Sequence, residues 1–100
     1  MRTFDRSRAL LERARRSLAG GVSSPVRGTA PVPLYFARGV GPRLQDADGQ
    51  WYLDYAGAWG PVILGYSHPA LVAAAHRAAE RPFTYGAQHE LEIWVAAGIQ

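Results

Sequence analysis

The chain has 100 residues, of which 48% are hydrophobic, and a formal net charge of +3, a composition typical of one small folded unit and not of a disordered segment. It has no Cys, which excludes disulfides and thiolate chemistry. No run reaches the roughly 18 apolar residues of a membrane helix, and residues 1–6 do not resemble a secretory signal, so we expect a cytoplasmic protein with no membrane partner.

Residues 5–18 are predicted to form an amphipathic helix. Its apolar residues recur at intervals of three and four: Leu10, Leu11, Ala14 and Leu18. Asp5 is expected to cap the first turn, because a short carboxylate accepts hydrogen bonds from the free amides there. Gly20 and Gly21 are expected to end the helix.

Arginines cover the other faces of this predicted helix, and the whole chain contains 11 Arg and no Lys. A nucleic-acid-binding helix is one hypothesis. Asp5 and Glu12 interrupt the cluster, however, and no aromatic residue is interleaved with it. A solvated face with cations near the helix C-terminus explains the pattern more simply, so we expect no nucleic-acid partner.

Residues 20–33 are predicted to form a loop, because Pro and Gly residues recur through it. A strand is expected at 34–37 and a turn at 39–42. Residues 43–46 and 50–54 are predicted to pair as a hairpin, with Asp48 capping its turn and Gly49 supplying a positive φ. Three apolar residues are expected to share one face of this hairpin: Leu44, Trp51 and Leu53.

Residues 55–68 are predicted to form a long loop, since Gly57, Gly60, Pro61 and Gly65 exclude a regular element. The loop is nevertheless apolar and aromatic, which indicates contact with a ligand or a partner chain. Helices are predicted at 69–80 and 89–98.

The first of these two helices begins with Pro69 and stops before Pro82, and the second has acidic residues in its first turn. The packed side of the helix at 69–80 is expected to consist of Leu71, Val72, Ala75 and Ala79. The whole pattern predicts an α+β unit made of a helix, a small set of strands, a long Gly/Pro loop and two helices.

Most familiar chemical motifs are missing. Gly39-Val40-Gly41 lacks the third glycine of a dinucleotide-binding turn, and Asp46-Ala47-Asp48-Gly49 lacks the spacing of a calcium loop. The three His residues lie far apart in sequence, so no metal site is expected. No Gly-x-Ser-x-Gly motif indicates a serine hydrolase.

One set of residues suits the binding of a carboxylate. Ser24 and Arg27 lie on a Pro-containing loop, where a guanidinium can offer two parallel donors and a hydroxyl a third. Trp59 could form a wall of the same pocket. The alternative, an Arg that is only solvated, stays open from the residues alone.

Two runs are characteristic: Ser24-Pro25-Val26-Arg27 and Trp59-Gly60-Pro61. They resemble the corresponding runs of glutamate-1-semialdehyde 2,1-aminomutases, a family within the class III pyridoxal-phosphate aminotransferases. The hairpin, the glycine loop and the His-Pro helix start resemble features shared across that class. The resemblance covers nearly all of the chain.

The resemblance implies the N-terminal segment, residues 1–100, of a fold-type-I enzyme that is α/β as a whole and homodimeric. Such an enzyme uses pyridoxal 5'-phosphate to convert glutamate-1-semialdehyde into 5-aminolevulinate for tetrapyrrole synthesis. By similarity, Ser24 and Arg27 would hold the substrate carboxylate and Trp59 would line its pocket.

The chain departs from that family in having no Lys to form the Schiff base. No catalytic residue is therefore assigned within it, its cofactor-binding residues are unknown, and the isolated chain is expected to be inactive. Another class III aminotransferase with a different donor or acceptor is one alternative, and a non-catalytic remnant or binding module is another. Uncovered apolar faces predict marginal stability or self-association.

Overall fold

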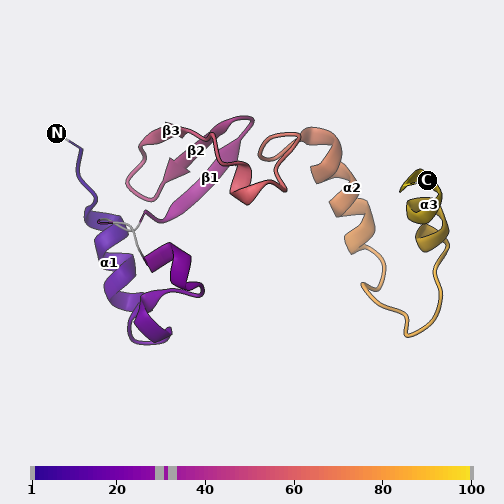
Figure 1. Cartoon of the computed structure of the whole chain (residues 1–100), viewed down its shortest axis with the longest axis horizontal. Helices are drawn as coiled ribbons and strands as arrows, with labels where there is room; N and C mark the ends of the chain where they lie inside the picture. Colours follow the sequence, from indigo (N-terminus) through magenta and orange to yellow (C-terminus); the bar gives the residue numbers. More distant parts are fainter. Residues whose placement is uncertain (1, 29–30, 32–33, 100) are drawn as a thin grey trace. The chain divides into compact units, whose positions relative to one another are not determined.

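The computed structural model describes residues 2–28, 31 and 34–99, so residues 29–30 and 32–33 of the predicted loop lie outside the described part (Figure 1). Three α-helices and one three-stranded antiparallel sheet are described, which confirms the α+β prediction. The chain divides into two compact units, Met1–His68 and Pro69–Gln100. None of the described helices is long and apolar enough to cross a membrane.

Helix α1 spans Asp5–Ala14 and is four residues shorter than predicted. After Ala14 the hydrogen bonds tighten, because the amides of Arg16 and Ser17 donate to carbonyls three residues back. Leu18 then adopts extended backbone angles (φ −119°, ψ 135°). The expectation that Gly20 and Gly21 end α1 is wrong. Both belong to a separate 3₁₀ turn, Ala19–Gly21. Both have the positive φ angles that glycine allows (65° and 76°).

The N-terminus of α1 is capped by a residue distant in sequence, and the expectation that Asp5 caps it is wrong. Phe4 stands at the N-cap position and supplies no side-chain acceptor. The carboxylate of Asp48 accepts hydrogen bonds from the Arg6 amide at 2.7 Å, the Ser7 amide at 3.0 Å and the Ser7 hydroxyl at 2.8 Å. A negative charge at this end of a helix also interacts favourably with its dipole.

The sheet has the strand order β1-β2-β3, with β1 at Phe36–Val40, β2 at Arg43–Asp46 and β3 at Trp51–Leu53. The hairpin of β2 and β3 confirms the prediction, whereas β1 begins two residues later than expected and continues to Val40. Leu44 pairs with Tyr52, and opposed residues point to the same side of a sheet. Leu44 therefore faces away from Trp51 and Leu53, contrary to expectation.

The turn between β2 and β3 is organised by Asp46, whose side chain is 1% exposed. Its carboxylate accepts from the amides of Asp48 (3.0 Å) and Gln50 (2.8 Å) and from the Tyr52 hydroxyl (2.7 Å). Asp46, and not Asp48, is thus the side-chain cap of the turn, which leaves Asp48 for α1. Gly49 has the positive φ predicted for it (86°).

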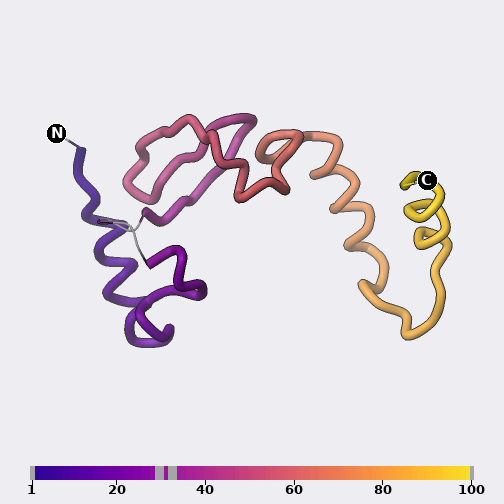
Figure 2. Tube along the Cα trace, viewed as in Figure 1, coloured from indigo at the N-terminus to yellow at the C-terminus, as the bar shows by residue number. Residues whose placement is uncertain are grey.

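The long loop after β3 returns to the sheet, as the trace in Figure 2 shows. Gly41 and Tyr66 exchange two backbone hydrogen bonds, of 2.9 and 2.8 Å. The Tyr66 ring lies so close over Gly39 that a Cβ there would be 2.7 Å from Cγ of the ring. The end of the loop is therefore fixed against the turn between β1 and β2.

The second unit contains helix α2, Pro69–Ala79, and helix α3, Glu90–Ile99. Pro69 opens α2 as predicted. At the start of α3, Nδ1 of His89 accepts from the Leu91 amide (3.0 Å), and Glu92 accepts from the His89 amide (3.1 Å). This reciprocal pattern is a capping box with His in the role usually taken by Ser or Thr.

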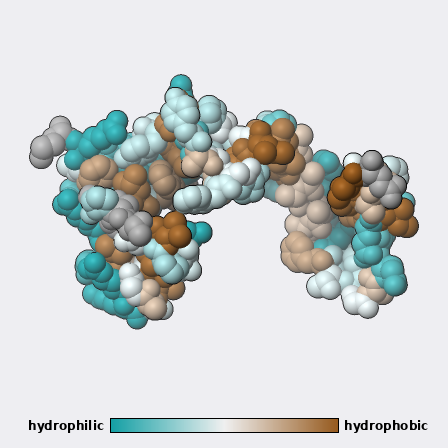
Figure 3. Space-filling model, in the orientation of Figure 1, coloured by the Kyte–Doolittle hydropathy of each residue, from teal (hydrophilic) through white to brown (hydrophobic). Residues whose placement is uncertain are grey.

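Hydrophobic side chains lie at the surface of both units (Figure 3). No hydrophobic residue in the described part of the chain is buried, and the predicted packed side of α2 is open, with Leu71 54% exposed. Hydrogen bonds that backbone amides donate to carboxylates therefore contribute much of the order in the first unit. Marginal stability of the isolated chain stays a prediction.

We predict that Asp48→Ala speeds amide hydrogen exchange at Arg6 and Ser7 and lowers the melting temperature, because the capping acceptor of α1 is lost. NMR exchange and circular dichroism measure the two effects. Asp5→Ala is the matched control, since Asp5 caps nothing and its removal should have the smaller effect. Equal effects of the two substitutions would contradict the assignment of the cap to Asp48.

Candidate functional site

Arg27 lies in a 3₁₀ turn, Pro25–Gly28, where its amide donates to the carbonyl of Ser24 at 3.0 Å. Nη1 of its guanidinium donates to Oγ of Ser23 at 2.9 Å. No carboxylate among the described residues forms an ion pair with Arg27. The guanidinium is thus a cation without a counter-charge, and it retains donors for an anionic ligand.

A hollow of about 320 Å³ lies beside this guanidinium. Its described walls are largely apolar and aromatic, and Arg27 carries the only charged side chain among the lining residues that the structure describes. The lining consists of Leu18, Gly21, Val22, Ser23, Arg27, Leu34, Tyr35 and Phe36. Apolar walls with one fixed polar group suit a small ligand that carries a carboxylate.

The structure brings together only part of the predicted site. Arg27 lines the hollow, but Ser24 and Trp59 do not. The hydroxyl in contact with Arg27 belongs to Ser23, which the sequence analysis did not select. Spacing could have suggested Ser23, because it lies four residues before Arg27 at the entrance to the same turn.

Trp59 belongs to an unusual turn in the loop between β3 and α2. Its side chain is 86% exposed. Four consecutive residues have positive φ: Gly57 (54°), Ala58 (53°), Trp59 (70°) and Gly60 (115°). A left-handed conformation costs about 1–2 kcal/mol for each residue with a Cβ, and such strain is concentrated at functional sites.

Asp54 holds the start of this left-handed turn. Its carboxylate accepts from the amides of Ala56 (2.8 Å) and Gly57 (3.1 Å) and from the Tyr66 hydroxyl (2.6 Å). The bond from Tyr66, followed by the Ala56 amide, holds the pKa of the Asp54 carboxyl below its ordinary value despite some desolvation. The same bond raises the pKa of the Tyr66 hydroxyl.

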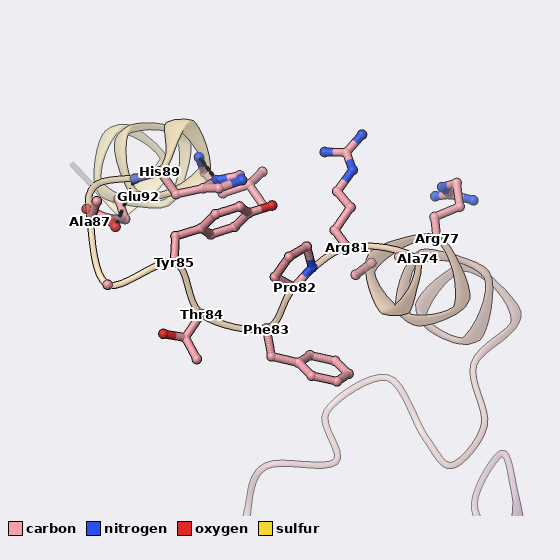
Figure 4. A pocket seen from close by; sticks show the side chains of 13 residues that line it. Ala74, Arg77, Arg81, Pro82, Phe83, Thr84, Tyr85, Ala87, His89 and Glu92 are labelled. Carbon is pink, nitrogen blue, oxygen red and sulfur yellow. Dashed lines mark hydrogen bonds between the residues drawn. The ribbon is translucent and has the colours of Figure 1, made fainter.

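A larger hollow, of about 910 Å³, lies in the second unit between the end of α2 and the start of α3. Figure 4 shows Tyr85 beside His89, with ring centroids 4.9 Å apart. The hollow contains none of the predicted site residues and has Arg77 and Arg81 at one side. Its volume alone does not identify a ligand, so we place the candidate site at Arg27.

No group of His, Cys, Asp or Glu within the described ranges could hold a metal ion.

The sequence of residues 25–94 matches the aminotransferase class-III family. The chain belongs to this family. Its curated relatives include the glutamate-1-semialdehyde 2,1-aminomutases of Dechloromonas aromatica and Sorangium cellulosum. They are 48% identical over 94 residues and 50% identical over 97 residues, which is 91% and 94% of this chain. The chain spans only 22% of either relative.

Solved structures of class III enzymes are similar over the same segment. A glutamate-1-semialdehyde aminomutase from Pseudomonas aeruginosa has a TM-score of 0.83 and 30% identity, covering 93% of this chain and 21% of that one. An omega-transaminase from Sphaerobacter thermophilus has a TM-score of 0.82 and 36% identity, covering 87% and 20%. The first unit and the helices that follow it thus have the fold of the corresponding segment in fold-type-I enzymes.

We predict that Tyr66→Phe raises the pKa of Asp54 toward the ordinary Asp value of about 3.9, because the hydrogen bond from the Tyr66 hydroxyl, the main cause of the lowered pKa, is removed. A lowered pKa in the folded state stabilises the fold above the unfolded pKa, and this contribution is lost as the pH falls through the folded pKa. Tyr66→Phe should therefore lose part of its stability at neutral pH and depend less on pH in the acid range.

NMR titration of the Asp54 carboxyl carbon measures this pKa, and urea unfolding at several pH values measures the stability. An unchanged Asp54 titration in Tyr66→Phe would contradict the assigned cause of the shift.

Proposed function

We propose that the chain is the N-terminal part of a pyridoxal-phosphate-dependent glutamate-1-semialdehyde 2,1-aminomutase that makes 5-aminolevulinate for tetrapyrrole synthesis. The observation that carries this proposal is the identity of 48–50% to curated aminomutases across more than nine-tenths of the chain. Arg27, which forms no ion pair with any described carboxylate, lines a small and largely apolar hollow. This supports the proposal, because the substrate of those enzymes carries a carboxylate.

Within this proposal, Arg27 binds the substrate carboxylate through its guanidinium. Ser24 fixes the turn through its carbonyl, which accepts from the Arg27 amide, and its hydroxyl is the proposed third donor to the carboxylate. Trp59 does not line the hollow of this chain, and it is proposed to form a further wall of the pocket in the whole enzyme. The Ser23 hydroxyl accepts a hydrogen bond from the Arg27 guanidinium and orients it, so the guanidinium is already positioned before the ligand binds.

The residues of this chain do not by themselves fit the cofactor. They include no Lys, so none of them can attach pyridoxal 5'-phosphate as a Schiff base. When bound, the cofactor supplies the electron sink for moving an amino group. The part proposed for this chain is to bind and orient the substrate, and the chain alone is expected to be inactive.

The remaining parts of the proposal concern the whole enzyme. We propose a homodimer that acts in the cytoplasm on a small substrate, without a nucleic-acid or membrane partner. The exposed apolar residues of both units support burial against other parts of such an assembly.

A class III aminotransferase with another amino donor or acceptor is the second candidate. It is favoured by the solved structures, because the omega-transaminase from Sphaerobacter thermophilus is 36% identical, whereas the aminomutase from Pseudomonas aeruginosa is 30% identical. The two candidates differ in what Arg27 must recognise.

We predict that Arg27→Ala, in a full-length enzyme containing this segment, lowers kcat/KM for glutamate-1-semialdehyde by roughly 10- to 100-fold. Loss of a hydrogen-bonded ion pair, worth about 1.5–3 kcal/mol, gives this range. Steady-state kinetics with the carboxylated aldehyde and with a matched aldehyde lacking the carboxylate measure the effect.

Arg16→Ala is the control, because Arg16 is exposed on the turn after α1 and does not line the hollow. An equal loss for both aldehydes with Arg27→Ala would favour the second candidate, since the carboxylate would then not be what Arg27 recognises.

A further inference from the structure

The orientation of Trp59 is determined by its backbone. Its side chain is 86% exposed, so little packing within this chain restrains the indole. The direction in which the indole leaves the loop therefore depends on the left-handed turn at residues 57–60. Ala58 and Trp59 would each relax to negative φ if nothing held the turn.

The loop has a fixed anchor at Tyr66. Two backbone hydrogen bonds join Tyr66 to Gly41, and its ring lies directly against Gly39. Gly65 also approaches the backbone of Gly41 so closely that a Cβ on Gly65 would be 3.1 Å from it. The Tyr66 hydroxyl is consequently held at a constant place relative to the sheet.

Asp54 joins this anchor to the turn. One oxygen of its carboxylate, Oδ2, accepts from the Tyr66 hydroxyl at 2.6 Å and from the Gly57 amide at 3.1 Å. The other, Oδ1, accepts from the Ala56 amide at 2.8 Å. The Asp54 amide donates to the carbonyl of Pro42 at 2.8 Å, so the backbone of Asp54 is fixed against the turn between β1 and β2, as Tyr66 is.

The handedness of the chain changes at this point. Ala56 has right-handed angles (φ −93°, ψ −23°), and Gly57 is the first left-handed residue (φ 54°). Successive amides at such a change converge on an anion, and here the anion is the carboxylate of Asp54. Asp54 thus stabilises the backbone where the left-handed turn begins.

We propose that Asp54 and Tyr66 are positioning residues, which hold residues 57–60 in the left-handed turn and thereby set the direction of the Trp59 indole. The effect on the backbone stands on the contacts above. The effect on a ligand rests on the proposed function, in which Trp59 forms a wall of the substrate pocket.

The backbone is tested in this chain with Asp54→Asn and Tyr66→Phe. Positive φ gives a strong intraresidue NOE between the amide and α protons, so NMR can follow Ala58 and Trp59 directly. We expect this NOE to weaken at both residues in both variants, while the cross-strand NOEs between Leu44 and Tyr52 remain. Tyr55→Phe is the matched control, because Tyr55 is 91% exposed and loses the same hydroxyl.

Three results would overturn the proposal. The first is an unchanged NOE at Ala58 and Trp59 in both variants. The second is loss of the Leu44–Tyr52 contacts in both, since the pair would then support the whole sheet and not the turn in particular. The third is a Tyr55→Phe variant that behaves like Tyr66→Phe.

The ligand effect is tested by kinetics in a full-length enzyme containing this segment. We expect Tyr66→Phe to raise KM for the carboxylated aldehyde by roughly tenfold and to change kcat little, because a displaced wall weakens binding more than chemistry. A change in kcat alone would contradict positioning through Trp59. Absence of aminomutase activity in the unmodified enzyme would refute the proposed function and leave the NMR result standing.

Discussion

The hydrogen bonds that the Asp48 carboxylate accepts from the start of α1 are the interaction on which the first unit depends. They join a helix to a hairpin turn across 42 residues of sequence. Asp46 makes this possible, because it closes the turn by itself and leaves Asp48 directed at Arg6 and Ser7. Ser7 is fully buried at the junction, whereas no described hydrophobic side chain is buried. In the first unit, a polar junction thus holds the helix and the hairpin together, a role that an apolar core has in most small domains.

The loop that carries Trp59 follows the same physical principle. A carboxylate, Asp54, accepts from two backbone amides and from a tyrosine hydroxyl, as Asp46 does in the hairpin turn. Such a cluster fixes the backbone without using apolar surface. The aromatic and aliphatic side chains of the loop therefore stay available for contacts with a ligand or with other parts of an enzyme, which agrees with the family to which the chain belongs.

Local signals in the sequence predicted what local geometry controls. Pro69 marked the start of α2, and Gly49 the positive φ of the hairpin turn. The partner of Asp48 could not be predicted, because a cap supplied from 42 residues away leaves no trace in spacing. The predicted faces of the hairpin were wrong, because the observed register places Leu44 opposite Tyr52. The left-handed turn was only partly foreseeable, since Gly57 and Gly60 permit it but Ala58 and Trp59 are there against their own preference.

The most direct test of the account is a chimera in which this chain replaces the matching first fifth of the Dechloromonas aromatica aminomutase. The measurement is the rate of 5-aminolevulinate formation from glutamate-1-semialdehyde, with cofactor content followed by absorbance. If this chain is the N-terminal part of such an enzyme, the chimera should bind the cofactor and form 5-aminolevulinate. A chimera that folds and binds the cofactor but forms none, or that prefers an aldehyde without a carboxylate, would contradict the account.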